Sequence, residues 1–324
     1  MRGRGAAAVA AGAHRSARWL GILAIAVLAV APATGRAWQA AQPFVGVTYF
    51  DKSITGPRPL HIHVAQIDLR APGIRFKVSP PGGDREVLRQ STLDFLKQER
   101  AQIAINGHFF LPFPSEDKTA WVIGLAASEG RVFSAFEIPE QSYALVAFAP
   151  AINIDRDNHA SIVTYDPSNS DQKHVREKVA LWNVVAGSSQ IVTRGVATTP
   201  AYRDDNHFDG ELDPGGPNNY SNSKAWADAT TARTAIGLSR DQQTLTLFTV
   251  DVRGGSEGMR LSEVADVLIR DFDVFDALNL DGGGSTTMAM EDAVTGNRAI
   301  VNVSSDNPLG RVVATSIAVF ANRR

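Results

Sequence analysis

The 324-residue chain contains no cysteine. Disulfide bonds, thiolate nucleophiles and cysteine-based metal sites are therefore excluded. Neither sign of charge is in large excess, since 32 basic residues face 34 acidic ones. General binding of nucleic acids depends on a basic surface, so this composition argues against that class of protein. Without disulfides the fold must rest on its hydrophobic core, for which a hydrophobic content of 44% is adequate.

Long apolar runs are absent except near the N-terminus. There, four arginines and no acidic residue precede an apolar run over residues 19–31, and small residues follow it. This order is typical of a secretory signal peptide. The alternative is a membrane anchor, but a spanning helix needs about 20 apolar residues, more than this run has. We expect residues 1–40 to be a signal peptide, with the mature N-terminus between about residues 33 and 43.

Cleavage of this segment leaves residues 41–324, a length that suits one large catalytic domain. Five arginines are lost with it, so the formal net charge moves from −2 to −7. The expected location is secreted or periplasmic, with no membrane contact after cleavage and no nucleic-acid partner. The sequence gives no indication of the oligomeric state.

Short strand-like segments make up much of the remaining chain. Residues 61–69 alternate apolar and polar side chains, as a half-buried strand does. Further strand candidates are residues 101–105, 144–148, 244–250, 277–280 and 312–320. Two helices are expected, one capped by Ser91 and one capped by Ser262. Many strands with few helices predict an α+β fold of mixed, largely antiparallel sheets and a few packed helices.

Residues 196–231 show neither a helical nor a strand period. A loop of this length is often a lid or a binding loop. The equally simple alternative is a solvent-exposed surface loop with no role in binding. Its acidic residues are Asp204, Asp205, Asp209, Glu211 and Asp213. Calcium takes oxygen ligands, so this cluster is a candidate calcium site, although it lacks the EF-hand pattern. No other cofactor is required.

The strongest local signal is the turn that begins at Asp281. An apolar segment runs into this aspartate, and three glycines and three hydroxyl residues follow it. Three consecutive glycines are costly to order, and their amides can form an anion-binding nest. The alternative is a purely structural role, in which the segment is a glycine-rich hairpin capped by Asp281. The segment is no phosphate-binding P-loop, because no lysine follows the glycines, and it lacks the dinucleotide spacing.

Two further segments place polar residues at strand ends. Asn106 follows an apolar segment and precedes Gly107 and His108. Its amide can bind a sugar hydroxyl or hold a neighbouring carboxylate, and the simple alternative is a turn residue. The simplest position for His108 is on the surface or at a pocket rim. Arg233 directly precedes an apolar strand. Its guanidinium is suited to phosphate oxygens, and the alternative is a structural arginine paired with a carboxylate.

Taken together, the segments 104–110, 233–237 and 280–287 resemble the phosphodiester glycosidase family in order and approximate spacing. Shorter similarities occur at residues 185–192, 249–253 and 310–314. The resemblance covers roughly residues 60–322, which is nearly all of the expected mature chain. The family usually has glycine at the position of His108, and this difference bears on the shape of the pocket and the substrate.

The resemblance implies a hydrolase that cleaves a glycosyl phosphodiester in a glycan or exopolysaccharide. The catalytic residues it implies are Asp281 at the anomeric carbon, Arg233 on the phosphate, and Asn106. The substrate-binding residues it implies are Gly107, His108, Gly282, Gly283, Gly284, Ser285, Thr286, Asp251 and Arg311. Two alternatives stay open on the same scaffold. One is a hydrolase of another glycosidic linkage, and the other is a non-catalytic exopolysaccharide-binding protein.

Overall fold

The computed structural model describes residues 38–136, 148–169, 174–199 and 227–324. The expected signal peptide over residues 1–40 lies almost entirely outside these residues, as does the whole acidic cluster between Asp204 and Asp213. Within the described ranges, no helix combines the length and the apolar character that a membrane crossing needs.

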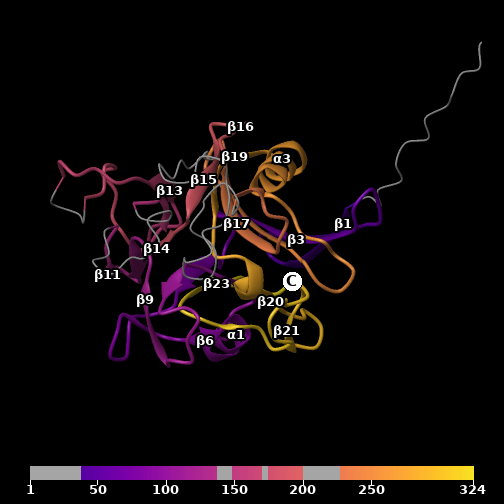
Figure 1. The fold of residues 1–324 in the computed structure, drawn as a ribbon. Coiled ribbons are helices and arrows are strands. Elements are labelled where there is room, and N and C mark those ends of the chain that lie inside the picture. The colour runs from indigo at the N-terminus through magenta and orange to yellow at the C-terminus, as the bar shows by residue number, and fades with distance from the viewer. Residues whose placement is uncertain (1–37, 137–147, 170–173, 200–226) are drawn as a thin grey trace, which may run out of the picture. The chain divides into compact units, whose positions relative to one another are not determined.

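The largest sheet has eight strands, and every pairing in it is antiparallel. Their spatial order is β1 (Gln39–Phe44), β2 (Val47–Ile54), β3 (Leu60–Asp68), β18 (Thr244–Val250), β17 (Arg233–Ser239), β19 (Val274–Asn279), β15 (Ser189–Thr193) and β16 (Val196–Ala197). Figure 1 shows its central strands running side by side. The strands expected over residues 61–69, 244–250 and 277–280 are therefore confirmed as parts of one sheet.

Two five-stranded antiparallel sheets accompany it. One consists of β21 (Arg298–Ile300), β20 (Met288–Glu291), β7 (Ile103–Asn106), β23 (Ser316–Phe320) and β4 (Arg75–Val78). The other consists of β11 (Arg131–Ser134), β10 (Ala126–Ser128), β14 (Asn183–Ala186), β12 (Ala151–Ile154) and β13 (Ala160–Val163). Shorter strands are β5 (Val87–Leu88), β6 (Gln90–Ser91), β8 (Phe110–Leu111), β9 (Thr119–Val122) and β22 (Val312–Val313). The expected α+β fold is thus sheet-rich, with antiparallel pairing throughout the described ladders.

The two faces of the large sheet bury different cores. Ile236 and Leu278 point into a core that also holds Ile105 and Ile317 of the sheet containing β7 and β23. Side chains of the opposite face pack against α3 (Leu261–Phe272), which lies beside β19 in Figure 1. Because a strand turns alternate side chains to opposite faces, burial on both faces makes the central strands almost continuously apolar.

Both expected helices form. The helix α1 (Thr92–Glu99) is capped by the Ser91 hydroxyl, which accepts from the Asp94 amide at 3.1 Å, so the expected cap is confirmed. The cap of α3 was predicted wrongly. Its N-cap is Arg260, two residues before Ser262, because the Glu263 carboxylate accepts from the Arg260 amide at 2.8 Å. A carboxylate at this position satisfies an amide that the first turn leaves unpaired.

Two segments differ from the sequence prediction, and a third lies mostly outside the described residues. Of the strand expected over residues 144–148 only Phe148 is described, and with a φ of 58° it is no strand residue. The strand expected over residues 312–320 is broken into β22 and β23 at residues 314–315. The segment from residue 196 begins with the short strand β16 before it leaves the described residues.

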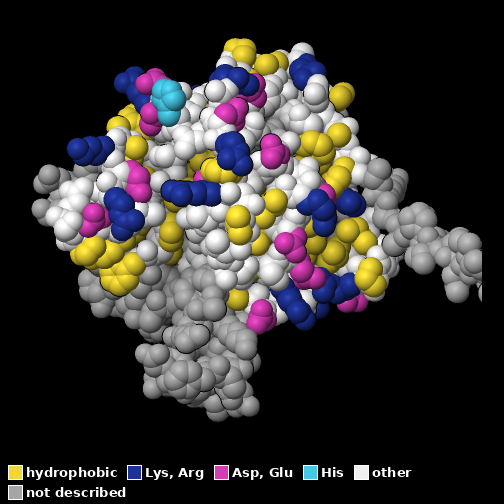
Figure 2. Space-filling model, turned by 90° about the horizontal axis from the view of Figure 1, so that it is seen from above, with side chains coloured by type: hydrophobic (Ala, Val, Ile, Leu, Met, Phe, Trp, Pro, Cys, Tyr) yellow, Lys and Arg dark blue, Asp and Glu magenta, His cyan; other side chains and the backbone are white. Residues whose placement is uncertain are grey.

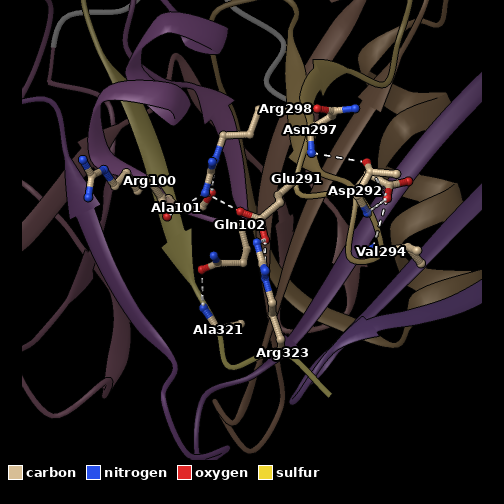
Figure 3. A network of polar contacts seen from close by, with 11 residues as sticks. Arg100, Ala101, Gln102, Glu291, Asp292, Val294, Asn297, Arg298, Ala321 and Arg323 are labelled. Carbon is tan, nitrogen blue, oxygen red and sulfur yellow. Dashed lines mark hydrogen bonds and ion pairs between the residues drawn. The ribbon is translucent and has the colours of Figure 1, made fainter.

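A buried ion cluster fixes the end of β7 that lies far from Asn106. The Glu291 carboxylate is fully buried and pairs with Arg298 and with Arg323, whose Nη2 lies 2.7 Å from Oε1 (Figure 3). The Glu291 amide donates to the carbonyl of Gln102 at 2.8 Å, next to the start of β7. A buried carboxylate needs such compensation. We interpret this cluster as an anchor for the C-terminal segment.

Candidate active site

The structure brings together two of the motifs that are far apart in sequence. Asn106 ends β7, and Asp281 follows β19. The Asn106 side-chain amide donates to the Asp281 carbonyl at 2.7 Å, and the Asp281 amide donates to the Gly107 carbonyl at 3.0 Å. The backbone of Asp281 is therefore held on both sides by the end of a rigid strand, which is how a side chain is positioned accurately.

Asn106 itself is fully buried. Its side-chain oxygen accepts from the Thr287 amide at 3.0 Å and from the Thr234 hydroxyl at 2.9 Å. These bonds engage the side-chain amide inside the protein, and a catalytic role for Asn106 stays a prediction. Asn106 joins β7, β17 and the turn after Asp281.

The glycines after Asp281 form a tight 3-10 turn over Gly283–Ser285. The Gly283 amide donates to the Ala232 carbonyl at 2.8 Å, and the Ser285 amide donates to the Gly282 carbonyl at 3.1 Å. The Thr286 amide is likewise bonded to a turn carbonyl. The expectation of an anion nest is therefore wrong for these three amides, because the Gly283 amide is bonded to the residue before β17 and the other two close the turn.

At Gly283 and Gly284, the local geometry explains why the residue is a glycine. Gly283 adopts a φ of 56°, a left-handed conformation that favours glycine. A Cβ on Gly284 would lie 2.1 Å from Nη2 of Arg311. The absent side chain therefore lets the Arg311 guanidinium pack directly on the turn, close to the Asp281 carboxyl.

The Asp281 carboxyl lies in a partly enclosed position, and the residue is half-buried. Burial raises the pKa of Asp281 to about 6. A hydrogen bond from the Ser285 hydroxyl and the charge of Arg311 oppose this rise, as does the Gly282 amide. A carboxyl with a pKa near the working pH, beside a cation and at a glycine-rich turn, has the properties of a catalytic group.

Arg311 is the cation on the accessible side of this carboxyl. Its Nε donates to the Asp306 carboxylate at 2.8 Å, and its Nη1 lies 3.4 Å from the Ser285 hydroxyl. The guanidinium carbon lies 4.8 Å from the centroid of the Phe113 ring, and 21% of the side chain is exposed. Asp281, Ser285 and Arg311 thus form one cluster, which we call the carboxylate–arginine cluster.

Arg233, the other expected cation, is fully buried at the start of β17. Its Nε donates to the Met259 carbonyl at 3.0 Å, and its Nη2 donates to the Ala229 carbonyl at 2.6 Å. These are the contacts of an arginine that holds backbone together. They engage Nε and one terminal nitrogen of the guanidinium with backbone carbonyls, and the phosphate-binding role expected for Arg233 stays a prediction.

We predict that Arg233→Met lowers the free energy of unfolding by about 2 kcal/mol, because the Met259 and Ala229 carbonyls lose charged donors and stay buried. A phosphate-binding role would instead reduce activity while leaving stability unchanged. Urea denaturation of the variant, followed by kinetics under conditions where it is fully folded, separates the two. A variant as stable as the wild type but inactive would restore the phosphate role.

Asp251 and His108 also take positions that differ from the prediction. Asp251 is fully buried, and its carboxylate accepts from the Asn302 side chain at 2.9 Å and from the Val303 amide at 3.0 Å. Asn302 in turn accepts from the Met288 amide at 2.7 Å. Asp251 therefore supports the chain beneath the turn. Asn302 was not predicted, because a single asparagine in a loop carries no sequence signal.

His108 is fully buried, so neither a surface position nor a pocket rim is correct. The Ala186 amide donates to its Nε2 at 3.0 Å, and its Nδ1 lies 2.8 Å from the Thr315 hydroxyl. Burial lowers the pKa of His108 to about 4. Its Nε2 also lies 3.1 Å from the Leu125 carbonyl, so both ring nitrogens of the neutral imidazole are engaged inside the protein. His108 therefore packs behind the site, where it is bonded to β14 and to Thr315.

Among residues 38–136, 148–169, 174–199 and 227–324, no group of three or more acidic, histidine or cysteine residues is placed to hold a metal ion. The acidic cluster proposed for calcium lies between Asp204 and Asp213, outside these ranges. Figure 2 shows acidic and basic side chains interspersed over the face that it draws.

Residues 99–320 match the phosphodiester glycosidase family. The match covers more than half of the chain, and the chain therefore belongs to this family, whose members are glycosidases that act on phosphodiester linkages of sugars. The family that the sequence motifs resemble is thus confirmed.

Among curated proteins, the chain is similar to N-acetylglucosamine-1-phosphodiester alpha-N-acetylglucosaminidase of Homo sapiens and of Mus musculus. In each case 59 residues align with 48% identity, which is 18% of this chain but only 11% of the relative. The aligned part is therefore a small fraction of those longer proteins.

Three solved structures share the fold. The zebrafish N-acetylglucosamine-1-phosphodiester alpha-N-acetylglucosaminidase catalytic domain, auto-inhibited by its pro-peptide, aligns with a TM-score of 0.57 and 21% identity over 89% of this chain and 88% of that one. A hypothetical protein from Synechocystis gives 0.58 and 15% over 89% and 64%. A Burkholderia pseudomallei protein described as exported gives 0.52 and 16% over 83% and 75%. At these identities the likeness concerns the fold alone.

Proposed function

We propose that this protein is an exported hydrolase of glycosyl phosphodiesters, cleaving the bond between the anomeric carbon and the phosphate oxygen. The observation that carries this proposal is the carboxylate–arginine cluster. It places a partly accessible carboxyl with a pKa of about 6 beside an accessible guanidinium, at the end of a rigid strand.

The chemistry divides between these two groups. The ionised Asp281 carboxylate acts at the anomeric carbon, either taking a proton from the attacking water or attacking directly. The carbon–oxygen bond breaks through an oxocarbenium-like transition state, and the electron pair leaves with the phosphate. Arg311 stabilises the negative charge that develops on the departing oxygens. The products are a sugar with a free anomeric hydroxyl and a phosphate monoester.

Phosphate leaves readily without being protonated, so a second carboxyl acting as general acid is unnecessary. The structure is consistent with a mechanism that has no general acid, because the group next to Asp281 is a permanent cation. We place Arg311 in the phosphate-binding role that the sequence suggested for Arg233, and we assign Ser285 to orienting the Asp281 carboxyl through its hydroxyl.

The relatives suggest the first substrate to test, since their names specify N-acetylglucosamine 1-phosphodiesters. For this chain we propose a phosphodiester-linked sugar in a glycan or exopolysaccharide. The N-terminal charge and apolar pattern, together with the exported description of one structural neighbour, supports cleavage of a signal peptide and a secreted or periplasmic location.

The decisive experiment is hydrolysis of α-N-acetylglucosamine 1-(methyl phosphate) in water enriched in ¹⁸O. The proposal predicts conversion of the phosphodiester to methyl phosphate by ³¹P NMR, with the label on the sugar carbon. Label on phosphorus would show phosphodiesterase chemistry instead. Cleavage of methyl α-N-acetylglucosaminide at an equal rate would favour an ordinary glycosidase. Binding of a glycan with no turnover would favour the non-catalytic alternative.

A further inference from the structure

We propose that the surface beside the carboxylate–arginine cluster is a subsite for a second phosphate on the leaving-group side, formed by Arg311 together with Arg89. This inference rests on the proposed function, because it assumes that Arg311 receives the scissile phosphate. It assigns the substrate to a class: a glycan or polyol chain that carries another phosphate beyond the bond that is cut.

The geometry connects the two guanidinium groups through aromatic rings in contact. Arg311 lies over the Phe113 ring at 4.8 Å, and Arg89 lies over the Phe110 ring at 4.9 Å. These two rings meet edge to face, with centroids 5.8 Å apart. Arg89 also donates through Nη2 to the carbonyl of Val312, the residue after Arg311, at 3.0 Å. The two cations are thus neighbours on one wall.

Arg89 is held in place without being neutralised. Its Nη1 donates to the carbonyls of Ser115 and Asp117 at 2.8 and 3.0 Å. In the part of the chain that the structure describes, no carboxylate lies within ion-pair distance of Arg89, and its Nε, a buried atom, has no hydrogen-bond partner. Carbonyls orient a guanidinium but leave its charge uncompensated, so this side chain is pre-organised for an anion.

Electrostatics on this wall support the same conclusion. The pKa of Arg89 is lowered, first by burial and then by the neighbouring charges of Arg311 and Arg85, against the opposing charge of Asp117. Asp117 is itself paired with Arg85 at 2.8 Å. Like charges that repel one another in the free protein are stabilised when an anion binds between them. Arg311 interacts electrostatically with Asp281 on one side and with Arg89 on the other.

The test compares two substrates that differ by one phosphate: N-acetylglucosamine 1-phosphoglycerol, and the same compound with a phosphate on the far glycerol hydroxyl. The readout is the ratio of kcat/KM for the compound with two phosphates to that for the compound with one. We expect a wild-type ratio of about 10 or more at low salt, falling toward one at high ionic strength.

Arg89→Gln should lower this ratio about tenfold, and Arg89→Lys, which keeps the charge, should lower it less. Arg75→Gln is the matched control, since Arg75 lies over the Phe320 ring at 3.5 Å on another part of the chain; its ratio should equal that of the wild type. If Arg89→Gln fails to fold by circular dichroism, Arg89→Lys and the salt dependence of the wild type decide the question.

Binding separates this inference from the proposed function. Calorimetry on Asp281→Asn measures the affinity for both compounds without turnover, and we expect the same tenfold preference for the second phosphate. A wild-type ratio near one, with the compound that has one phosphate cleaved normally, would overturn the subsite alone. If neither compound is cleaved, the proposed function fails, and equal affinities in calorimetry would then overturn the subsite as well.

Discussion

Asp281→Asn is expected to lose at least about a hundredfold in kcat/KM on a sugar 1-phosphodiester while keeping its fold, the usual scale for a positioned catalytic group. Asparagine has nearly the same size, and its carbonyl still accepts from Ser285 or from the Gly282 amide, the two donors to the native carboxyl. It cannot take a proton from water or attack the anomeric carbon. The loss should therefore fall mainly on kcat.

The same variant should be more stable than the wild type at neutral pH. The pKa of Asp281 is about 6 in the folded protein, above the ordinary aspartate value of 3.8. The protonated Asp281 carboxyl makes its full contribution to the free energy of unfolding below about pH 4. This contribution is lost as the pH rises through 6 and the carboxyl ionises. At pH 7.5 the partly buried, ionised Asp281 therefore lowers the free energy of unfolding of the wild type. Allowing for partial exposure, we expect Asp281→Asn to gain about 1 kcal/mol, or roughly 2–3 °C in Tm.

Thermal melts at pH 4.5 and pH 7.5, with kinetics on the same preparations, test both statements. A stability gain at pH 7.5 that shrinks at pH 4.5, combined with inactivity, supports the catalytic role. In the wild type, kcat/KM should rise with pH through an apparent pKa near 6, because the ionised form acts. If Asp281→Asn is fully active, the carboxyl only caps the turn, and asparagine is an equally good cap.

Arg311→Ala should reduce kcat/KM on a phosphodiester by about a hundredfold to a thousandfold, the usual effect of removing a group that stabilises charge in the transition state. Stability should change little, because the partner Asp306 has 43% of its side chain exposed and returns to water. Arg311→Lys keeps the charge but loses the planar fork, so it should recover only part of the activity.

A second readout distinguishes Arg311 from a merely structural residue. Its charge lowers the pKa of Asp281, so Arg311→Ala should move the acid limb of the kcat/KM profile to higher pH. Arg75→Ala, another arginine stacked on an aromatic ring, should change neither the rate nor the limb. Near-normal turnover in Arg311→Ala, with an unchanged pH profile, would show that Arg311 does not bind the scissile phosphate and that another cation does.

Several features of the fold were predictable because they depend on local patterns. The alternation over residues 61–69 predicts β3, and the serine at position 91 predicts the start of α1. The break before β23 and the N-cap of α3 were missed. In α3 the cap depends on Glu263, which the Arg58 side chain also binds from 205 residues away. A contact over that separation leaves no trace in local sequence.

The sequence by itself determined the family, the antiparallel character of the sheets and the segments that meet at the site, because glycine runs and strand-end polar residues are local signatures of backbone geometry. Only the tertiary structure decided what each side chain does. Arg233, Asn106, Asp251 and His108 are buried behind the site, while Arg311 lies at its accessible edge. Residue type sets what chemistry a side chain can perform. Whether it reaches a substrate depends on burial and on the hydrogen bonds that the rest of the chain supplies, and those are set by residues distant in sequence.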